Sequence, residues 1–373
     1  MFDRRPLPSF LVAFPGLLLL SACAASSTPD PGSPDLEGGL HIDTGVTGET
    51  GVPFDAGGDG GGLGGDVAPV ESGPGDGITY VYAHTDTDLY SLNPATDAVT
   101  KIGPFTGGAT SITDLAINGD NQMFVNSATE VYTATLPAGG TGPVALALKS
   151  TLPAGSKFYA LAFVPKGVLS ADEALIAGDD QGDLYYIDSS SASPVPQKLG
   201  SFGNWQSGDP NPSTKSTTKD TWALSGDLLF YMDGTTPRGI ATVRTCFTST
   251  STGKTKCYSD NDVVVEVDMA ALKANFDSKG STTSLRKRLL GGAAGTGRLF
   301  GLGAWGDKIY AFSRHSSGSA TTGSPALPPE LVIIDGTGAG TVAKQFGTAA
   351  SPDFSNGWSG AGVTTKAKVS VIK

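Results

Sequence analysis

The sequence predicts an all-β fold built from repeated units, because one short strand pattern recurs five times. The copies are Asp88–Asn93, Glu130–Thr135, Asp183–Asp188, Val263–Asp268 and Glu330–Asp335. Each is a run of β-branched or aromatic residues, which favour strands, and four of the five begin with an acid. Four end in Asp or Asn, as is typical where a chain turns out of a sheet. Copies that begin 42 to 80 residues apart indicate a repeat architecture.

Further strands surround each copy, so that a complete unit contains four. A strand of small residues comes first, an apolar strand second, the repeated strand third and a lysine-bearing strand last. In the fourth unit the expected strands are Asp220–Ser225, Leu228–Asp233, Asp262–Asp268 and Leu285–Leu290. The first unit begins with Ile78–Ala83 and lacks an opening strand, which we assign to Ser359–Val363 near the C-terminus.

Four antiparallel strands per unit, closed into a ring by the N- and C-terminal strands, describe a β-propeller. The chain resembles β-propeller proteins in general over about 290 residues, without the signatures of a subfamily. We count five blades, and six stays open because Lys366–Ile372 can add a strand. Lysines occur on each last strand, where they are interpreted as protection of a sheet edge rather than as a basic binding rim. They are Lys101, Lys149, Lys198, Lys287 and Lys344.

The first 22 residues read as a signal peptide. Arg4 and Arg5 precede an apolar run from Phe10 to Leu20, which is too short to span a membrane as a helix. Leu20–Ser21–Ala22–Cys23 follows and resembles the lipobox of bacterial lipoproteins. The resemblance implies that Cys23 becomes the lipidated N-terminus, and Ala24 after it implies export to the outer membrane. An ordinary secretory signal with a chance cysteine is the alternative.

Residues 23–77 read as a lipidated cysteine followed by a disordered linker. Residues 24–77 contain ten acids, sixteen glycines and no Lys or Arg. Such a composition cannot bury enough apolar surface to offset its ordering entropy, and as a coil it would span roughly 40 Å. Most of the net charge of −11 lies here, so the propeller domain at 78–373 is nearly neutral. A nearly neutral domain argues against a nucleic-acid partner, and we expect a monomer.

Cys246 and Cys257 flank a stretch rich in Ser, Thr and Gly that reads as a hairpin tip. An exported chain enters an oxidising compartment, so we expect a disulfide between them. A metal site is the alternative, but His41, His84 and His315 are scattered singly. We therefore expect no metal and no cofactor.

Three insertions interrupt the repeats and supply the candidate binding face. They are Asn204–Lys219, Gly234–Asn261 and Arg314–Pro329. Alternation of the strands places all three on one face of the disc, and loops on a rigid scaffold are where binding sites usually occur. The candidate ligand-binding residues are Trp205, Arg244, Tyr258, Arg314 and His315. Aromatic rings offer flat contact surfaces and arginine offers a planar fork for carboxylates, although the aromatics can equally cover the loop bases.

No set of residues stands out as catalytic. Asp114 and Asp220 lie near expected innermost strands, whereas Asp120, Asp227 and Asp307 fall in expected turns and are interpreted as turn formers. We therefore favour a non-catalytic envelope lipoprotein whose propeller binds a glycan or protein. A polysaccharide hydrolase, with two carboxylates facing each other across the channel mouth, is one alternative. A purely structural envelope protein is the other.

Overall fold

The structure, a computed structural model, describes residues 80–207, 209, 220–248, 255–257, 262–282, 284–292, 298–314, 328–346 and 357–370. All of them belong to the compact unit Gly64–Lys373, the second of two in the chain. The predictions for the signal peptide, Cys23, the linker, Tyr258 and His315 concern residues outside this part of the chain. Among the described residues, no helix is long and apolar enough to cross a membrane.

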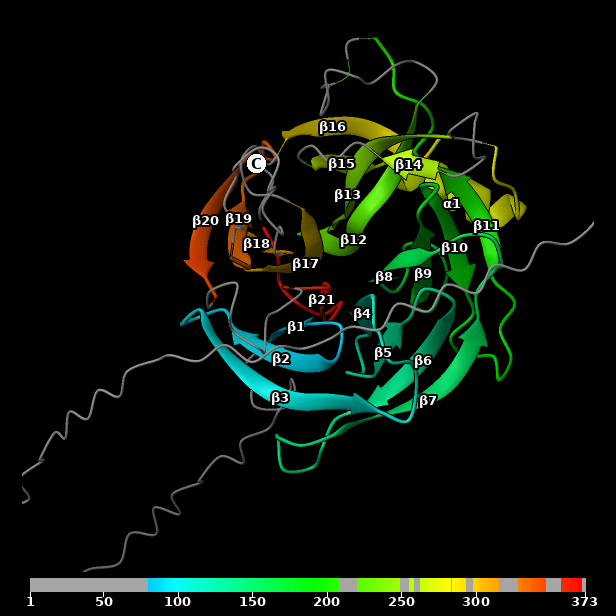
Figure 1. The fold of residues 1–373 in the computed structure, drawn as a ribbon. Helices are drawn as coiled ribbons and strands as arrows, with labels where there is room; N and C mark the ends of the chain where they lie inside the picture. The colour runs from blue at the N-terminus through cyan, green and yellow to red at the C-terminus, as the bar shows by residue number, and fades with distance from the viewer. Residues whose placement is uncertain are drawn as a thin grey trace, which may run out of the picture. The chain divides into compact units, whose positions relative to one another are not determined.

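The described strands form an all-β propeller with five four-stranded antiparallel sets, which we call blades 1 to 5 (Figure 1). Blade 1 contains β21 (Gly360–Val363), β1 (Val81–His84), β2 (Asp88–Asn93) and β3 (Ala98–Thr106). Blade 2 contains β4 (Asp114–Ile117), β5 (Met123–Asn126), β6 (Glu130–Thr135) and β7 (Val144–Thr151). Blade 3 contains β8 (Phe158–Val164), β9 (Ala174–Asp179), β10 (Asp183–Ile187) and β11 (Gln197–Ser201).

Blade 4 contains β12 (Thr221–Asp233), β13 (Thr236–Thr248), β15 (Val263–Val267) and β16 (Arg286–Gly292), with β14 (Thr255–Cys257) paired to β13. Blade 5 contains β17 (Leu299–Trp305), β18 (Lys308–Ser313), β19 (Glu330–Ile334) and β20 (Gly340–Gln345). The innermost strands β21, β4, β8, β12 and β17 contact one another in that order, and β17 contacts β21 again. This closed ring confirms the predicted fold class.

The two ends of the domain meet in blade 1, as the sequence predicts. Strand β21 runs antiparallel to β1, with Val363 opposite Val81 and Gly360 opposite His84. Beyond β21, the described residues 364–370 form isolated bridges, such as those from Val369 to Asp233 and Gly306, and no strand. The described part of Lys366–Ile372 therefore adds no sixth blade.

Blade 4 corrects the sequence analysis. The two strands expected at Asp220–Ser225 and Leu228–Asp233 are one continuous strand, β12, and the second strand of the blade is β13, inside the expected insertion Gly234–Asn261. The register of β12 against β13 shifts between Leu224 and Leu228, which accommodates Gly226 and Asp227 without a turn. Asp227 is fully buried and accepts hydrogen bonds from the backbone N–H groups of Leu228 and Leu302, so it is not a turn former.

The predicted disulfide is confirmed. Cys246 near the end of β13 faces Cys257 of β14, and their sulfur atoms are bonded. The one described helix is α1 (Met269–Ser278), and the Asp268 side chain caps its start by accepting a hydrogen bond from Ala271 N. It lies between β15 and β16.

The lysines of the outermost strands support the sheets. Lys101 Nζ lies 3.1 Å from Asp88 Oδ1, and Lys198 Nζ lies 2.6 Å from Asp183 Oδ2. In both cases the acid that opens the repeated strand pairs with a lysine on the neighbouring edge strand. Exposed pairs of this kind contribute little stability, but they keep the sheet edge charged.

The axis of the ring is filled by side chains. Leu115, Leu161, Leu228 and Leu302 line it together with residues of β21, and they leave a cavity of only about 10 Å³. A ligand therefore has access to the two faces of the propeller and not to a passage through it.

Candidate functional site

All five innermost strands begin on the same side of the ring, which we call the top face. Strand pairing places Phe158 opposite Asp179, Thr221 opposite Cys246 and Leu299 opposite Ser313. Each second strand therefore ends, and each third strand begins, on this face as well. It is the face to which the sequence assigned its candidate loops.

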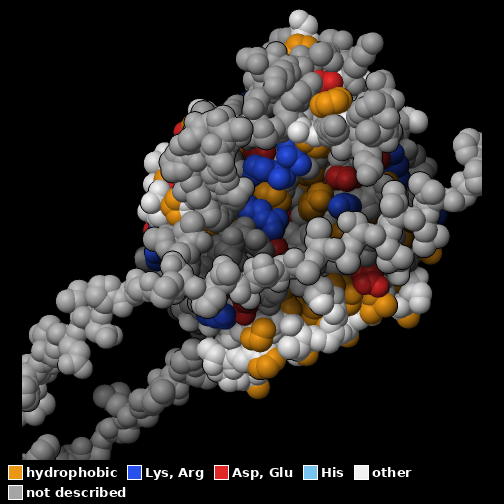
Figure 2. Space-filling model, in the orientation of Figure 1, with side chains coloured by type: hydrophobic (Ala, Val, Ile, Leu, Met, Phe, Trp, Pro, Cys, Tyr) orange, Lys and Arg blue, Asp and Glu red, His pale blue; other side chains and the backbone are white. Residues whose placement is uncertain are grey.

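Three arginines converge at the centre of the top face, and we call Arg244, Arg298 and Arg314 the arginine cluster. Arg244 is in β13, Arg298 directly precedes β17, and Arg314 directly follows β18. The guanidinium carbons of Arg298 and Arg314 lie 4.4 Å and 5.0 Å from the centre of the Phe300 ring. Figure 2 shows basic side chains gathered near the middle of the visible face. Cation–π contact with one shared ring holds two of the three cations in place.

Burial and mutual repulsion make the charged state of the arginine cluster energetically unfavourable. Burial, the neighbouring charge of Arg244 and that of Arg314 lower the pKa of Arg298 to about 10, despite the opposing charge of Asp262. Burial also lowers the pKa of Arg244, whereas the charges of Asp262, Tyr159 and Asp180 act in the opposite direction. Like charges held together out of water are favourable only when anionic partners compensate them.

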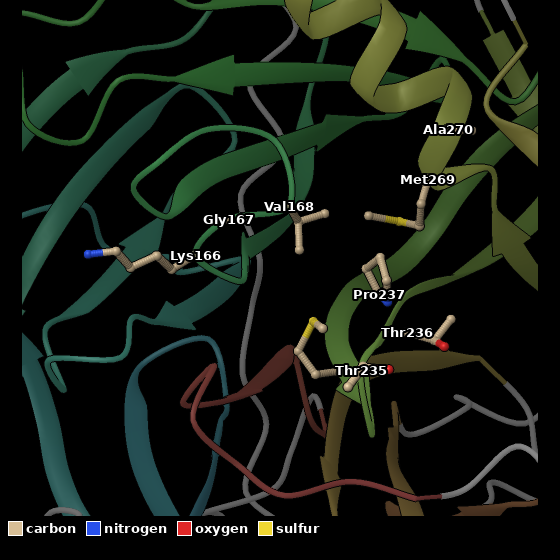
Figure 3. A pocket seen from close by; sticks show the side chains of 9 residues that line it. Lys166, Gly167, Val168, Thr235, Thr236, Pro237, Met269 and Ala270 are labelled. Atoms are coloured by element: carbon tan, nitrogen blue, oxygen red, sulfur yellow. The ribbon is translucent and has the colours of Figure 1, made fainter.

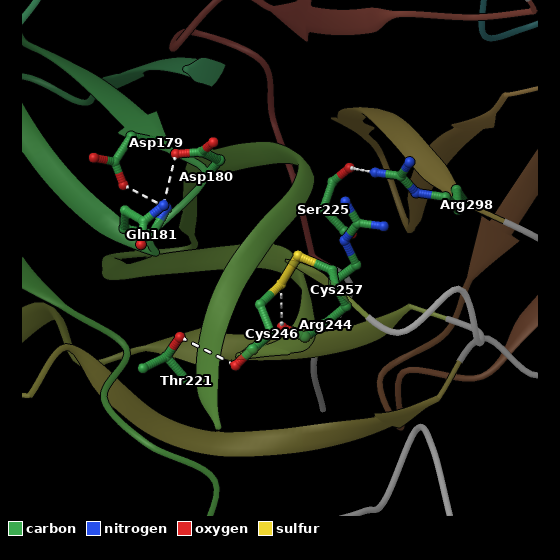
Figure 4. The surroundings of a disulfide bond; sticks show 9 residues. All are labelled: Asp179, Asp180, Gln181, Thr221, Ser225, Arg244, Cys246, Cys257 and Arg298. Carbon is green, nitrogen blue, oxygen red and sulfur yellow. Dashed lines mark hydrogen bonds between the residues drawn. A yellow bond between two sulfur atoms is a disulfide. The ribbon is translucent and has the colours of Figure 1, made fainter. Parts of the chain in front are cut away.

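The three arginines differ in how far they are paired. The Arg314 side chain donates to both carboxylate oxygens of Asp86, over 2.9 and 3.0 Å. Arg298 Nη2 donates to the backbone oxygen of Ser225 over 2.8 Å (Figure 4). The Nε atoms of Arg244 and Arg298 are buried and have no hydrogen-bond partner. Arg314 is thus fixed by a carboxylate, while the other two retain donors.

The structure places the described candidate residues of the sequence analysis in two settings. Arg244 and Arg314 belong to the arginine cluster. Trp205 lies on the same side, because its backbone N–H donates to the backbone oxygen of Asp220, directly before β12. Its side chain packs against the buried core of blades 3 and 4. That packing favours a covering role for Trp205. Arg298 was not among the candidates predicted from the sequence. The one sequence feature that could have indicated it was its position directly before an innermost strand.

The carboxylates considered for a hydrolase do not form an open pair. Asp114 and Asp227 are near neighbours inside the ring, but both are fully buried. Asp114 Oδ2 accepts from Leu161 N over 2.6 Å, which ties blade 2 to blade 3. Asp220 is 3% exposed. Within the described residues, no group of three or more His, Cys, Asp or Glu side chains is arranged to bind a metal.

The buried carboxyl pair makes stability depend on pH. Burial raises the pKa of Asp227 to about 7, and burial together with the charge of Asp227 raises the pKa of Asp114 well above its usual value. Between about pH 4 and 7 the native state therefore binds more protons at these groups than the unfolded state, and the free energy of unfolding falls as pH rises. His84 acts oppositely, because burial lowers its pKa to about 4 and its contribution to stability is lost as pH falls below 6.5.

We expect Asp114→Asn to reduce the amount by which the free energy of unfolding falls between pH 5 and pH 7. The amide oxygen can still accept from Leu161 N, but one of the two carboxyls that must ionise is removed. Urea unfolding at pH 5 and pH 7 measures the effect, and the difference between the two pH values should be smaller in the variant than in the parent. An equal difference in both proteins would show that the pair does not titrate in this range.

Two grooves hollow the opposite face, which we call the bottom face. One, of about 820 Å³, is lined by polar side chains that include Gln122 and Asp188, with Tyr186 among them. The other, of about 510 Å³, is mainly apolar and lies between Val168, Pro237 and Met269 (Figure 3). The larger groove also carries four acids, Asp120, Asp172, Glu173 and Asp188. Lys166 pairs with Asp172 and Lys366 pairs with Asp120 at its rim.

Comparisons with known proteins give structural neighbours only. No family model and no curated protein matches the sequence. Among solved structures, a protein of unknown function from Bacteroides caccae aligns with a TM-score of 0.37 and 8% identity, over 77% of this chain and 98% of that one. The Dos1 propeller aligns with a TM-score of 0.32 and 12% identity, over 73% of this chain and 68% of that one.

A third neighbour is the β-propeller domain of Myceliophteria thermophila Cps50 (Swd1). It aligns with a TM-score of 0.33 and 11% identity, over 72% of this chain and 83% of the other. Similarity at this level carries no inference about function. The function has to be argued from the residues of the two faces.

Proposed function

We propose that this protein is a lipid-anchored binding module of the cell envelope, which holds a glycan or protein partner on its top face. The observation that carries the proposal is the arginine cluster, because Arg244 and Arg298 are half-buried cations with donors that no described residue uses. The cluster stands on a rigid ring of strands, with its three residues in or directly beside strands of blades 4 and 5. Rigid scaffolds that present loops are the usual setting of binding sites.

The sequence supplies the anchoring part of the proposal. The lipobox-like residues Leu20–Cys23 would leave Cys23 as the lipidated first residue, and the acidic linker would hold the propeller away from the membrane. The hydrolase alternative is less well supported, because Asp114 and Asp227 are inaccessible and each accepts backbone hydrogen bonds. We therefore propose binding without turnover.

A capture experiment tests the binding face. The full chain would be immobilised and exposed to glycans and proteins from the envelope of its source, beside a top-face variant, Arg244→Glu, and a bottom-side control, Lys368→Glu. We expect a partner retained by the parent and the control and lost by the top-face variant. Retention of every partner by Arg244→Glu, or conversion of a captured glycan to shorter products, would contradict the proposal.

Anchoring has its own test. We expect Cys23→Ala to move the protein from the membrane fraction to the soluble fraction and to remove the mass of the attached lipid. Fractionation and mass spectrometry of both proteins measure this. A variant that stays in the membrane fraction at the mass expected from its sequence would contradict lipidation at Cys23.

A further inference from the structure

Arg244 and Arg298 form a pair whose hydrogen-bonding capacity exceeds what the described protein supplies. Arg298 has one hydrogen bond, to the neutral backbone oxygen of Ser225, and no ion pair joins either guanidinium to a described carboxylate. Figure 4 shows the two side chains reaching the same region, beside Ser225. Asp262, whose charge acts on both, uses Oδ2 to accept from Leu299 N, whereas its buried Oδ1 has no hydrogen-bond partner. One buried carboxyl beside two guanidinium groups leaves donors unused, and a further anion would compensate the remaining positive charge of the pair.

The geometry of the pair suits a planar oxyanion. Two converging guanidinium groups can donate parallel hydrogen bonds to both oxygens of a carboxylate. Arg298 is held against Phe300 and by Ser225 O, so little conformational freedom remains to be lost when a ligand binds. A preorganised fork of this kind favours a carboxylate over a spherical ion.

The groups beside the pair indicate what carries the carboxylate. The charges of Asp180 and Tyr159 act on Arg244, and both side chains are half-buried. Asp180 Oδ1 already accepts from Lys157 N and Gln181 Nε2, which leaves Oδ2 for a ligand. Asp180 can accept hydrogen bonds from hydroxyl groups, and the Tyr159 hydroxyl can both donate and accept. A sugar acid presents its hydroxyls next to its carboxylate and can use these groups. A glutamate or aspartate side chain has no hydroxyl next to its carboxylate, so an acidic peptide would leave Asp180 and Tyr159 without partners.

We propose that Arg244 and Arg298 bind the carboxylate of a uronic acid residue in an acidic glycan, with Asp180 and Tyr159 contacting its hydroxyls. The inference rests on the proposed function and specifies the ligand of the same face. Arg314, already paired with Asp86, contributes positive charge to the site rather than a direct contact.

The test is titration calorimetry on the full chain with four probes. These are a galacturonic acid trisaccharide, its neutral galactose counterpart, a triglutamate peptide of equal side-chain charge and inorganic phosphate. We expect binding of the uronate alone, and an affinity about 10- to 100-fold lower in Arg298→Gln and Arg244→Gln, because each loses charge-assisted hydrogen bonds. Arg298→Lys, which keeps the charge but not the fork, should also bind more weakly, and Lys368→Gln should bind as the parent does.

Several results would overturn the inference. They are no binding of the uronate by a folded parent, equal binding of the uronate by both arginine variants, equal binding of triglutamate, and equally tight binding of inorganic phosphate. Thermal melts establish that each variant is folded, and Arg298→Lys provides a second variant if Arg298→Gln does not fold. If the uronate fails but a partner is still captured through the top face, only the ligand class is wrong and the proposed function stands.

Discussion

Truncation after Asp353 is expected to abolish the cooperative unfolding of the whole propeller, and not merely to trim its end. The deletion removes β21, which is the innermost strand of blade 1 and contacts both β17 and β4. It also removes Trp358, which is fully buried, with its ring centre 5.2 to 5.3 Å from those of Tyr90, Phe312 and Phe346. Loss of a buried tryptophan alone costs about 3 to 5 kcal/mol.

Near- and far-ultraviolet circular dichroism during thermal melting measures this effect. A chain that ends at Ser370 is the matched control, because it keeps β21 and the bridges of Val369. We expect the control to melt as the full chain does and the longer truncation to show no sharp transition. An unchanged melting temperature after truncation at Asp353 would mean that the ring does not depend on its C-terminal strand.

Gly226→Ala is expected to lower the free energy of unfolding by about 3 kcal/mol or more, because it would force two strands apart. A Cβ atom at Gly226 would lie 2.0 Å from Leu299 O and 2.7 Å from Phe300 Cα. Both are backbone atoms of β17, which cannot move without shifting blade 5. The substitution would also disturb Phe300, the ring under Arg298 and Arg314.

Gly139→Ala is the control, because a Cβ atom there meets nothing within 4 Å. In a domain of this size 3 kcal/mol corresponds to a fall in melting temperature of about 5 °C, which a thermal melt resolves. We expect Gly139→Ala to stay within about 1 °C of the parent. Similar melting temperatures for the two variants would show that β12 and β17 can separate at little cost.

Much of the fold could be predicted from local patterns. The strand expected at Asp88–Asn93 has the observed bounds, because alternating apolar residues between Asp and Asn specify both the strand and its ends. Blade 4 could not be predicted in the same way. The dipeptide Gly226–Asp227 has the composition of a turn, and only contacts with β17 in the next blade explain why it lies inside a strand.

The candidate site could also be predicted only in part, because some of its contacts depend on how one blade packs against the next. Strand alternation assigned Arg244 and Arg314 to insertions on one face, but Arg244 lies in strand β13 and not in a loop. Arg298 and its shared contact with Phe300 depend on how blade 5 packs against blade 4, and no local pattern encodes that. The pairing of Lys101 with Asp88 was also missed, although both residues were noticed, because it requires the register between two strands.

The pairing of β1 with β21 also determines when, relative to synthesis of the chain, the propeller can close. Val81 and its partner Val363 are 282 positions apart, so β1 is synthesised long before the strand that covers it. At about 5 to 20 residues per second, roughly 15 to 55 seconds separate the two. During that interval β1 is an open edge that can pair with other chains. Final ring closure thus has to follow synthesis, and we expect aggregation at this stage to limit the yield of folded protein.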